Sequence, residues 1–176
     1  VLVPVIFALL LNEIKNVAFK RCIQTVVYLP HFISWVIMGG ILLDVFGLYG
    51  PINMVLSAFG MEPIAFFRIS KLFRTLAIGT DVWKEFGFNA VVYLAALTGI
   101  SPSLYEAAAI DGAGRWSRMW HITLPGLKPV IVLMTILALG NILNAGFDQI
   151  YNIYNQAGYS TGDIIDSWVY RVGLND

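Results

Sequence analysis

The sequence predicts an all-α, polytopic membrane protein, and three observations support this fold class. Hydrophobic residues make up 58% of the 176 residues, charged residues make up 12%, and the mean hydropathy is +0.74. Apolar segments approach the roughly 20 residues that a helix needs to cross a bilayer. Short stretches of charged and turn-forming residues separate these segments. Because about a quarter of the residues in a soluble domain are charged, the composition excludes that class.

Several functional classes are excluded by equally simple features. The 11 basic and 11 acidic residues cancel, so nothing indicates a nucleic-acid partner. A single cysteine, Cys22, excludes an internal disulfide. His31 and His121 have no neighbouring ligand or nucleophile pattern, so we expect packing or interfacial roles, with no catalytic residue and no metal site. The sequence has no Gly-x-x-x-x-Gly-Lys-Ser/Thr stretch, so we expect no cofactor and assign ATP to a partner chain.

The first part of the chain predicts the end of one span and a second span. Residues 1–11 are about half as long as a membrane helix, which indicates the tail of a truncated span. The charged loop of residues 12–21 contains basic side chains that favour the cytoplasm. A span is then expected over residues 23–46, where Pro30 would kink the helix and Gly39-Gly40 would permit close helix contact.

An outer loop is expected over residues 47–73. Apolar side chains at helical spacing between residues 52 and 59, closed by Gly60, predict a short amphipathic helix at the membrane interface. This helix is either part of an outer gate or receptor-landing surface, or a connector that shields other parts from solvent.

The next predicted span, residues 74–100, contains three charged side chains. Charge at the bilayer centre is costly, so Asp81, Lys84 and Glu85 should lie near the outer end or face the protein interior. Lys84 is expected to neutralise Asp81 or Glu85. Four-residue steps give a polar stripe along the helix that consists of Asp81, Glu85, Asn89 and Tyr93.

A further span, expected over residues 129–150, presents polar side chains in the same manner. Amides, carboxylates and aromatic rings bind hydroxyl-rich solutes, so the two polar faces predict a translocation pathway. The alternative is hydrogen bonding between helices, with Trp and Tyr as interfacial anchors. The candidate pathway residues are Trp83, Glu85, Asn89, Tyr93, Asn141, Asn144 and Asp148.

Between these two spans lies the longest polar interruption, residues 101–128, and its start predicts a helix. Ser101 places a cap residue before Pro102, which suits the first turn, so the helix should begin at about Pro102. Ser103 and Glu106 have the spacing of a capping box.

The second half of this interruption predicts a turn and another short helix. Asp111-Gly112 is a turn signal, because glycine accepts backbone angles that a side chain forbids. Residues 115–121 can form one or two further helical turns before Pro125 stops them. We therefore expect an L-shaped helix pair on the membrane surface.

The end of the chain is expected to lie outside the membrane again. Thr161, Gly162 and Asp163 can start a helix, and apolar residues within 164–173 predict that it lies at the interface. No repeat, linker or low-complexity tract is present, so residues 1–176 are expected to form a single membrane domain.

The interruption contains the pattern Glu-Ala-Ala, three residues, Gly, nine residues, Ile, one residue, Leu-Pro. This pattern resembles the EAA loop of the permease subunits of bacterial binding-protein-dependent ABC importers. Residues 28–37 and 163–173 are similar to the polysaccharide and oligosaccharide branch of these permeases. The matching loop residues are Glu106, Ala107, Ala108, Gly112, Ile122, Leu124 and Pro125.

The resemblance implies a type I ABC importer permease core in the bacterial cytoplasmic (inner) membrane. This multi-pass fragment would contain three full or nearly full spans and the end of another. The implied partners are ABC ATPase subunits, a second homologous permease subunit, an extracytoplasmic solute-binding protein or lipoprotein, and the lipid bilayer. The chain would serve carbohydrate import as conduit and lever and would not be an enzyme.

The resemblance also assigns ATPase docking to the EAA loop, which we define as residues 101–128. Small Ala107 and Ala108 permit close seating in a groove, and Glu106 can pair with a basic or polar group there. Gly112 is expected to turn the chain where a Cβ atom would collide, and Pro125 to lead back into the membrane. The predicted docking residues are Glu106, Ala107, Ala108, Asp111, Gly112, Ile122, Leu124 and Pro125.

Two other functions stay open. In an ion-coupled secondary transporter, the charges around Asp81 and Glu85 would couple an ion to solute movement, and transport would not need an ATPase. A non-transporting membrane scaffold or sensor would use the same loop to bind a soluble partner, without solute flux.

Overall fold

Helices account for all regular secondary structure in the part of the chain that the structure describes. The structure is a computed structural model, and it describes residues 1–144, 146–153 and 163–175. Within these ranges the predicted all-α class is confirmed. The helices are α1 (Leu2–Asn12), α2 (Val17–Phe32), α3 (Trp35–Val45), α4 (Pro51–Ala58), α5 (Ser70–Thr98), α6 (Pro102–Ile110), α7 (Arg115–Arg118), η1 (Met119–Thr123), α8 (Leu124–Gly140), α9 (Phe147–Ile153) and α11 (Ile165–Asn175).

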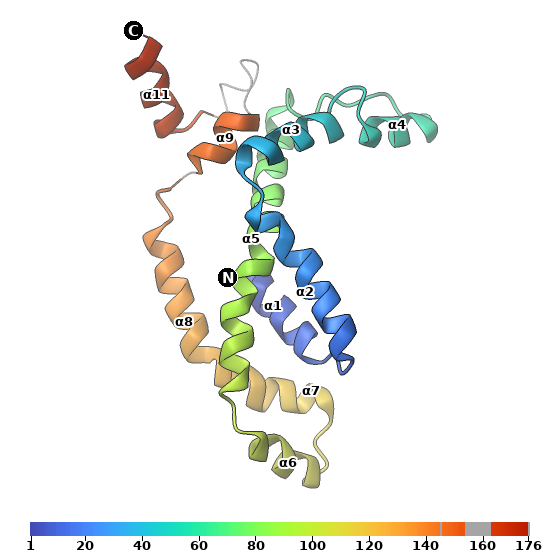
Figure 1. Cartoon of the computed structure of the whole chain (residues 1–176), viewed down its shortest axis with the longest axis vertical. Helices are drawn as coiled ribbons and strands as arrows, with labels where there is room; N and C mark the ends of the chain where they lie inside the picture. Colours follow the sequence, from blue (N-terminus) through green and yellow to red (C-terminus); the bar gives the residue numbers. More distant parts are fainter. Residues whose placement is uncertain (145, 154–162, 176) are drawn as a thin grey trace. The chain divides into compact units, whose positions relative to one another are not determined.

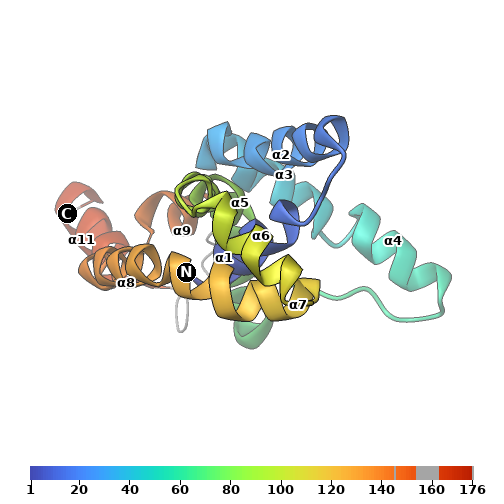
Figure 2. The same cartoon turned by 90° about the horizontal axis from the view of Figure 1, so that it is seen from below.

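The chain divides into two compact units. Unit 1 contains Val1–His31 and Lys84–Ile142, and unit 2 contains Phe32–Trp83 and Leu143–Asp176. The long helix α5 contributes its first half to unit 2 and its second half to unit 1. Figures 1 and 2 show α6 and α7 next to each other at one end of unit 1. This end of unit 1 contains the EAA loop.

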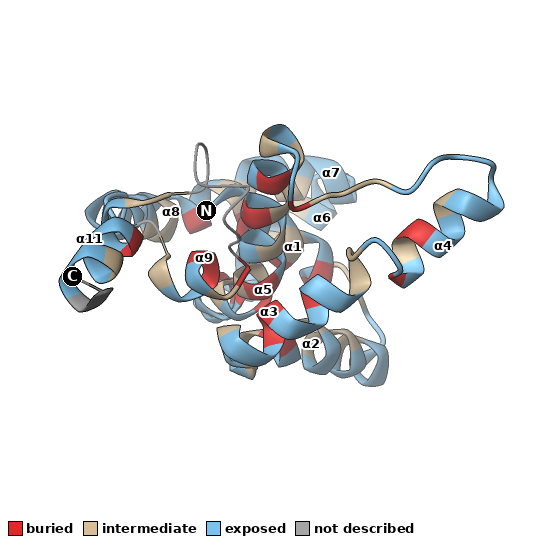
Figure 3. Ribbon diagram, turned by 90° about the horizontal axis from the view of Figure 1, so that it is seen from above, coloured by how far each residue is buried: buried red, intermediate tan, exposed pale blue. Residues whose placement is uncertain are grey.

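Most helices expose apolar side chains. Figure 3 shows that exposed surface dominates the helices and that buried positions are scattered among it. One helix of 26 residues, Arg115–Gly140, is long and apolar enough to cross a membrane by itself, and only 11% of its most apolar window is buried. Two bent helix pairs add further candidate spans among the described residues. One pair is α2 with α3, the other is α5 with α6, and each pair would count as one bent span. An apolar helix with so little burial is typical of contact with lipid or with other membrane helices.

The core of unit 1 is formed by α1, α5 and α8. Val5 and Ala8 of α1 are buried together with Ala90 and Tyr93 of α5. Partly buried side chains of α8 pack against this cluster, namely Val130, Ile131 and Met134. This packing fixes the two helices that precede and follow the EAA loop.

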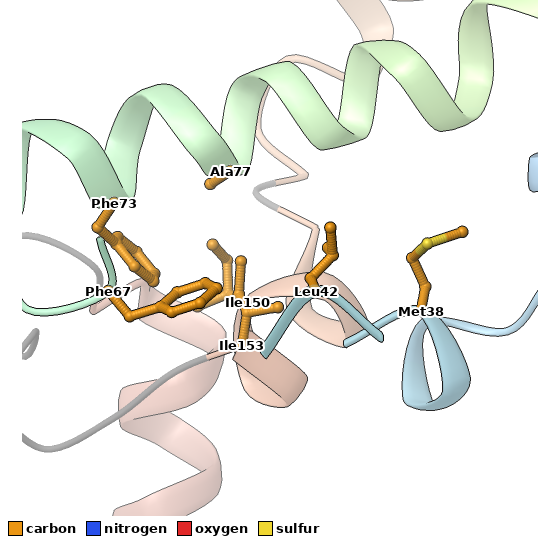
Figure 4. Packing of buried hydrophobic residues seen from close by; sticks show 7 residues of the cluster. All are labelled: Met38, Leu42, Phe67, Phe73, Ala77, Ile150 and Ile153. Atoms are coloured by element: carbon orange, nitrogen blue, oxygen red, sulfur yellow. The ribbon is translucent and has the colours of Figure 1, made fainter. Parts of the chain in front are cut away.

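The core of unit 2 joins α3, α5, α9 and the segment before α5. Figure 4 shows the side chains of Phe67 and Phe73 close to those of Ile150 and Ile153. The buried Gln149 amide donates to the Ala77 carbonyl oxygen at 2.6 Å and to the Thr80 hydroxyl at 3.0 Å. These hydrogen bonds join α9 to α5, because a buried amide without partners would cost free energy. The complete cluster consists of Met38, Leu42, Phe67, Phe73, Ala77, Ile150 and Ile153.

Two glycines allow helices to approach closely, one in each unit. A Cβ atom at Gly39 would lie 2.8 Å from Cβ of Asn152, so α3 contacts α9 through this position. Gly40 has no atom within 4 Å of such a Cβ, so the predicted close contact is confirmed at Gly39 alone. In unit 1, a Cβ at Gly87 would overlap the carbonyl oxygen of Val27, which places α5 directly against α2.

The predicted span over residues 23–46 is divided into two helices, α2 and α3, which are bent by 103° relative to each other, so a single helix kinked at Pro30 is wrong. The interruption follows Phe32 and does not lie at Pro30, which is inside α2. Ser34 has an extended backbone with ψ of 153°, and its hydroxyl accepts the N–H of Ile37 at 3.4 Å. Ser34 therefore caps the N-terminus of a new helix.

The predicted span over residues 129–150 is also wrong in its bounds. α8 begins before Pro129 and ends at Gly140, and residues 141–144 and 146 precede the separate helix α9. In this segment the Asn144 side-chain oxygen accepts the N–H of Gly146 at 3.2 Å. Such local bonding of asparagine competes with helix and favours a turn.

Two predicted interfacial helices are confirmed as helices. The short helix expected over residues 52–59 is α4, and it is followed by Gly60 with a φ of +77°. The last predicted helix is α11, which is preceded by Asp163, and that carboxylate pairs with Arg171 at 2.7 Å. Thr161 and Gly162, the other predicted helix-start residues, lie outside the described residues.

Candidate functional site: the EAA loop and the polar stripe of α5

The EAA loop begins with α6 at the residue that the sequence predicts. Ser101 is the N-cap, and Pro102 occupies the first turn, where its missing N–H costs no helical hydrogen bond. The predicted capping box is wrong. Since Ser101 holds the cap position, Ser103 lies inside the first turn and Glu106 lies too far along the helix. The two serine hydroxyls are 2.7 Å apart.

The end of α6 has the hydrogen bonds of a Schellman motif. The N–H of Ala113 donates to the Ala108 carbonyl at 2.8 Å, and the N–H of Gly112 donates to the Ala109 carbonyl at 3.1 Å. Gly112 has a φ of +78°, which confirms the predicted turn. The predicted collision is wrong, because no atom lies within 4 Å of a Cβ placed there. The positive φ is what requires glycine.

α6 presents an exposed surface with no buried residue. Glu106 and Ala107 are exposed, Ala108 is half-buried, and Asp111 caps the C-terminus. Among the described residues, the Glu106 carboxylate neither forms an ion pair nor accepts a hydrogen bond. Ile110 is 87% exposed at the tip of the helix. The sequence analysis did not single out Ile110, although an apolar side chain just before the Asp-Gly turn could have indicated an exposed apolar residue at the end of the helix.

After Gly114 the chain forms one continuous helix through α7, η1 and α8. The prediction that Pro125 stops this helix is wrong. The N–H of Leu124 donates to the Met119 carbonyl, five residues back, so the helix is widened to a π turn just before the proline. Ile122 and Leu124 are half-buried in this region, and Pro125 is exposed. π turns often occur at functional positions.

One contact joins the two halves of the EAA loop, another joins the loop to α1, and no sequence pattern predicted either. The Tyr105 hydroxyl of α6 lies 3.0 Å from the hydroxyl of Thr123, which is 4% exposed. The Arg115 Nε lies 3.6 Å from Glu13 Oε2 at the end of α1. α6 is therefore joined to the helix that begins at Arg115, and that helix is joined to α1.

The charged residues in the middle of α5 form a network with the end of α2. Lys84 is 5% exposed, and its ammonium donates to the His31 carbonyl at 3.0 Å and lies 3.3 Å from Glu85 Oε1. Glu85 Oε2 lies 2.9 Å from His31 Nδ1, and the imidazole stacks on Phe88. The predicted pairing of Lys84 with Glu85 is confirmed. The lysine also satisfies a carbonyl in the last turn of α2, which a cation stabilises.

The polar stripe of α5 runs from an exposed surface into the core of unit 1. Asp81 is exposed, Glu85 and Asn89 are half-buried, and Tyr93 is 1% exposed. A four-residue step advances about 40° around the helix, so successive members turn gradually toward the core. The Tyr93 hydroxyl has no hydrogen-bond partner among the described residues.

The other candidate pathway residues do not form a second helical face. Asn141 is the C-cap of α8, Asn144 lies in the turn, and Asp148 lies in the first turn of α9. Asn141 belongs to unit 1, whereas Asn144, Asp148 and the half-exposed Trp83 belong to unit 2. The predicted face on a single span is thus wrong, because the helix ends at Gly140. No group of three metal-ligating side chains occurs in the ranges that the structure describes.

Comparisons with known proteins give consistent results. The profile of the family described as "Binding-protein-dependent transport system inner membrane component" matches residues 1–170. The polygalacturonan/rhamnogalacturonan transport system permease protein of Bacillus subtilis (strain 168) is 46% identical over 98% of this chain and 54% of that protein. The lactose transport system permease protein of Rhizobium radiobacter is 35% identical over 96% of this chain and 57% of that protein.

A similar fold has been solved by crystallography. A chain in the crystal structure of a bacterial ABC transporter involved in the import of the acidic polysaccharide alginate superposes with a TM-score of 0.94. It is 40% identical, and the match covers 98% of this chain and 61% of that chain. A second structure of an alginate ABC transporter, in complex with an alginate pentasaccharide-bound periplasmic protein, gives a TM-score of 0.93. The present chain spans about half the length of the curated relatives it matches.

Proposed function

Because this chain belongs to the family of binding-protein-dependent transport system inner membrane components, we propose that it is the permease part of an ATP-driven carbohydrate importer. The solute is an oligosaccharide or polysaccharide, in line with the saccharides named for its relatives. The chain contributes to the translocation pathway by alternating access. ATP is hydrolysed by separate ABC ATPase subunits.

The geometry of α6 carries this proposal. A coupling element must be rigid, accessible and attached to the spans that it moves. α6 is short and exposed, and its C-terminus is held by the Schellman bonds around Gly112. Its accessible Glu106 offers a charge, and Ala107 offers little bulk, to a groove in the ATPase. The contact of Tyr105 with Thr123 transmits movement of α6 to the helix that enters the membrane.

The pathway itself is assigned to the half-buried part of the α5 stripe. Asn89 and Glu85 present an amide and a carboxylate on a helix that continues almost directly into α6. Only residues 99–101 separate α5 from α6, and the two helices are bent by 69°. Trp83, Asn144 and Asp148, which belong to unit 2, are kept as candidates on the basis of their chemistry alone. Such groups suit sugar hydroxyls.

The remaining partners follow from the same proposal. A second homologous permease subunit completes the pathway, and an extracytoplasmic solute-binding protein delivers the saccharide. The permease crosses the inner membrane several times, with the EAA loop in the cytoplasm. The ion-coupled alternative has less support, because Lys84 and His31 already engage Glu85 within the chain.

Co-purification with the ATPase tests the proposal. In the assembled transporter, Glu106→Lys inverts the exposed charge of α6, and we expect several-fold less ATPase to co-purify from membranes. Glu62→Lys makes the same charge change at an exposed position in the segment after α4, and it should leave the ATPase bound.

Uptake of labelled saccharide by the native transporter then separates the alternatives. Uptake that requires ATP and survives collapse of the ion gradient supports the importer. Uptake without an ATPase would favour the ion-coupled transporter, and partner binding with no uptake would favour the scaffold.

A further inference from the structure

A polar cavity of about 310 Å³ lies beside the EAA loop in unit 1. Its walls come from the end of α1 and the loop after it, from α6, and from the first turns of the helix that begins at Arg115. Figure 1 shows the end of α1 next to α7, which agrees with these walls. The proposed ATPase contacts of Glu106 and Ala107 do not use the cavity. The polar groups that line it include Glu13, Lys15, Tyr105, Arg115, Arg118 and Thr123.

The wall of this cavity has an excess of positive charge. Arg115 lies 3.6 Å from Glu13, so one cation is already matched by an acid. Lys15 and Arg118 have no ion-pair partner within the described residues, which leaves two positive charges for a ligand. The hydroxyls of Tyr105 and Thr123 supply hydrogen-bonding groups in the same space. A phosphate suits this set, because a guanidinium binds two phosphate oxygens at once and an ammonium adds a point charge.

The position of the cavity along the helices corresponds to the depth of lipid headgroups. The apolar helix α1 ends at Asn12, and the helix that is long and apolar enough to cross a membrane begins at Arg115, and both of these residues line the cavity. Trp116 and Trp120 are 69% and 62% exposed on the same helix. Exposed tryptophans are typical of the boundary between lipid and water. The side of the membrane rests on the proposed function, since the EAA loop is then cytoplasmic.

We propose that this cavity binds the phosphate of an anionic phospholipid headgroup from the inner leaflet. Basic pockets between membrane helices on the cytoplasmic side are recurrent sites for such headgroups. The bound headgroup bridges Lys15, which follows α1, and Arg118, which precedes the π turn. It thereby stabilises the EAA loop in its position against unit 1.

Counting retained lipids by native mass spectrometry tests this site. The assembled transporter is purified from membranes that contain phosphatidylglycerol, and the lipids that remain bound are counted. Lys15→Gln with Arg118→Gln removes both unmatched charges and keeps the pair of Arg115 with Glu13. We expect retention to fall about fivefold for each basic residue removed.

A matched control removes the same charge outside the cavity. Lys20→Gln with Arg21→Gln changes two basic residues of the neighbouring helix α2, and retention should stay near the native level. Equal losses in the two double variants would overturn the site, because they would indicate general attraction to an anionic surface. If equimolar inorganic phosphate displaces phosphatidylglycerol, the proposal of a lipid ligand is overturned and the cavity is assigned to a free anion.

The ATPase content of the same samples distinguishes this proposal from the proposed function. If the cavity variant keeps its native ATPase content and also retains as much lipid as the native transporter, the lipid site is overturned and the proposed function is not affected. If that variant loses the ATPase in purely zwitterionic lipid, the cavity is assigned to a protein partner. This outcome would also overturn the lipid site. Absence of the ATPase from the native transporter would instead count against the proposed function.

Discussion

Gly112 differs from Gly114, two residues later, in its backbone conformation. The φ of Gly112 is +78°, whereas the φ of Gly114 is −68°. Neither position has another atom within 4 Å of where a Cβ atom would lie, so the available space is the same. A methyl group therefore strains only Gly112, by about 1–2 kcal/mol, because L residues disfavour the left-handed region.

Gly112→Ala should weaken the end of α6 and lower both ATPase co-purification and saccharide uptake severalfold. Gly114→Ala adds the same methyl group without the strain, so both quantities should stay near the native values. The two variants are compared in membranes with equal amounts of permease. If Gly112→Ala matches the native transporter in both assays, the Schellman turn has no part in coupling.

Single residues of the EAA loop could be predicted from the sequence, but their contacts could not. The spacing from Glu106 to Pro125 identified the loop, and Asp111-Gly112 identified the turn. The contact of Tyr105 with Thr123 depends on two helices whose relative direction no local pattern encodes. The backbone angle expected of Gly112 was right, but the expected collision of a Cβ atom was wrong, because empty space cannot be read from a sequence.

At the scale of elements, the contact between α2 and α5 depends on Gly87. A Cβ atom there would overlap the Val27 carbonyl oxygen, whereas a Cβ at Gly79 on the same helix meets no atom within 4 Å. Gly87→Val should destabilise the transporter by about 1–3 kcal/mol, the usual cost of overpacking. Gly79→Val is the control and should unfold near the native temperature.

Thermal unfolding of the purified transporter in detergent measures both effects. The network of Lys84 with the end of α2 lies close to Gly87 along the helix, so moving α2 away should also disturb that network. A Gly87→Val transporter that unfolds at the native temperature would show that α2 can shift without loss of stability.

Element boundaries were predictable only where polar or turn residues mark them. Pro102, Gly60 and the charged residues around the loops located α6 and α4 to within a residue or two. The break at Ser34 was not foreseen, because apolar residues continue on both sides and a helix in lipid needs no polar face to mark its end. The end of α8 at Gly140 was missed for the same reason, and so the polar residues after it were assigned to a helix.

At the scale of the whole chain, α5 connects the polar stripe to the coupling element. Its second half carries Asn89 in unit 1, and only residues 99–101 separate its end from α6. A movement of α6 that is imposed by the ATPase therefore reaches the stripe through one continuous helix. In the reverse direction, solute held at Asn89 can bias the position of α6, since coupling between two sites is reciprocal.

This reciprocity gives a test that separates coupling from assembly. Asn89→Leu removes a half-buried amide but keeps the size of the side chain, so solute-stimulated ATP hydrolysis should fall severalfold while the ATPase stays bound. Thr98→Val, at the α6 end of the same helix, removes a hydroxyl that donates to the Ala95 carbonyl of its own helix at 2.7 Å, and stimulation should persist. ATP hydrolysis is measured in vesicles with and without the saccharide-loaded binding protein. Unchanged stimulation in Asn89→Leu would assign the stripe to helix packing, whereas loss of the ATPase would assign Asn89 to assembly.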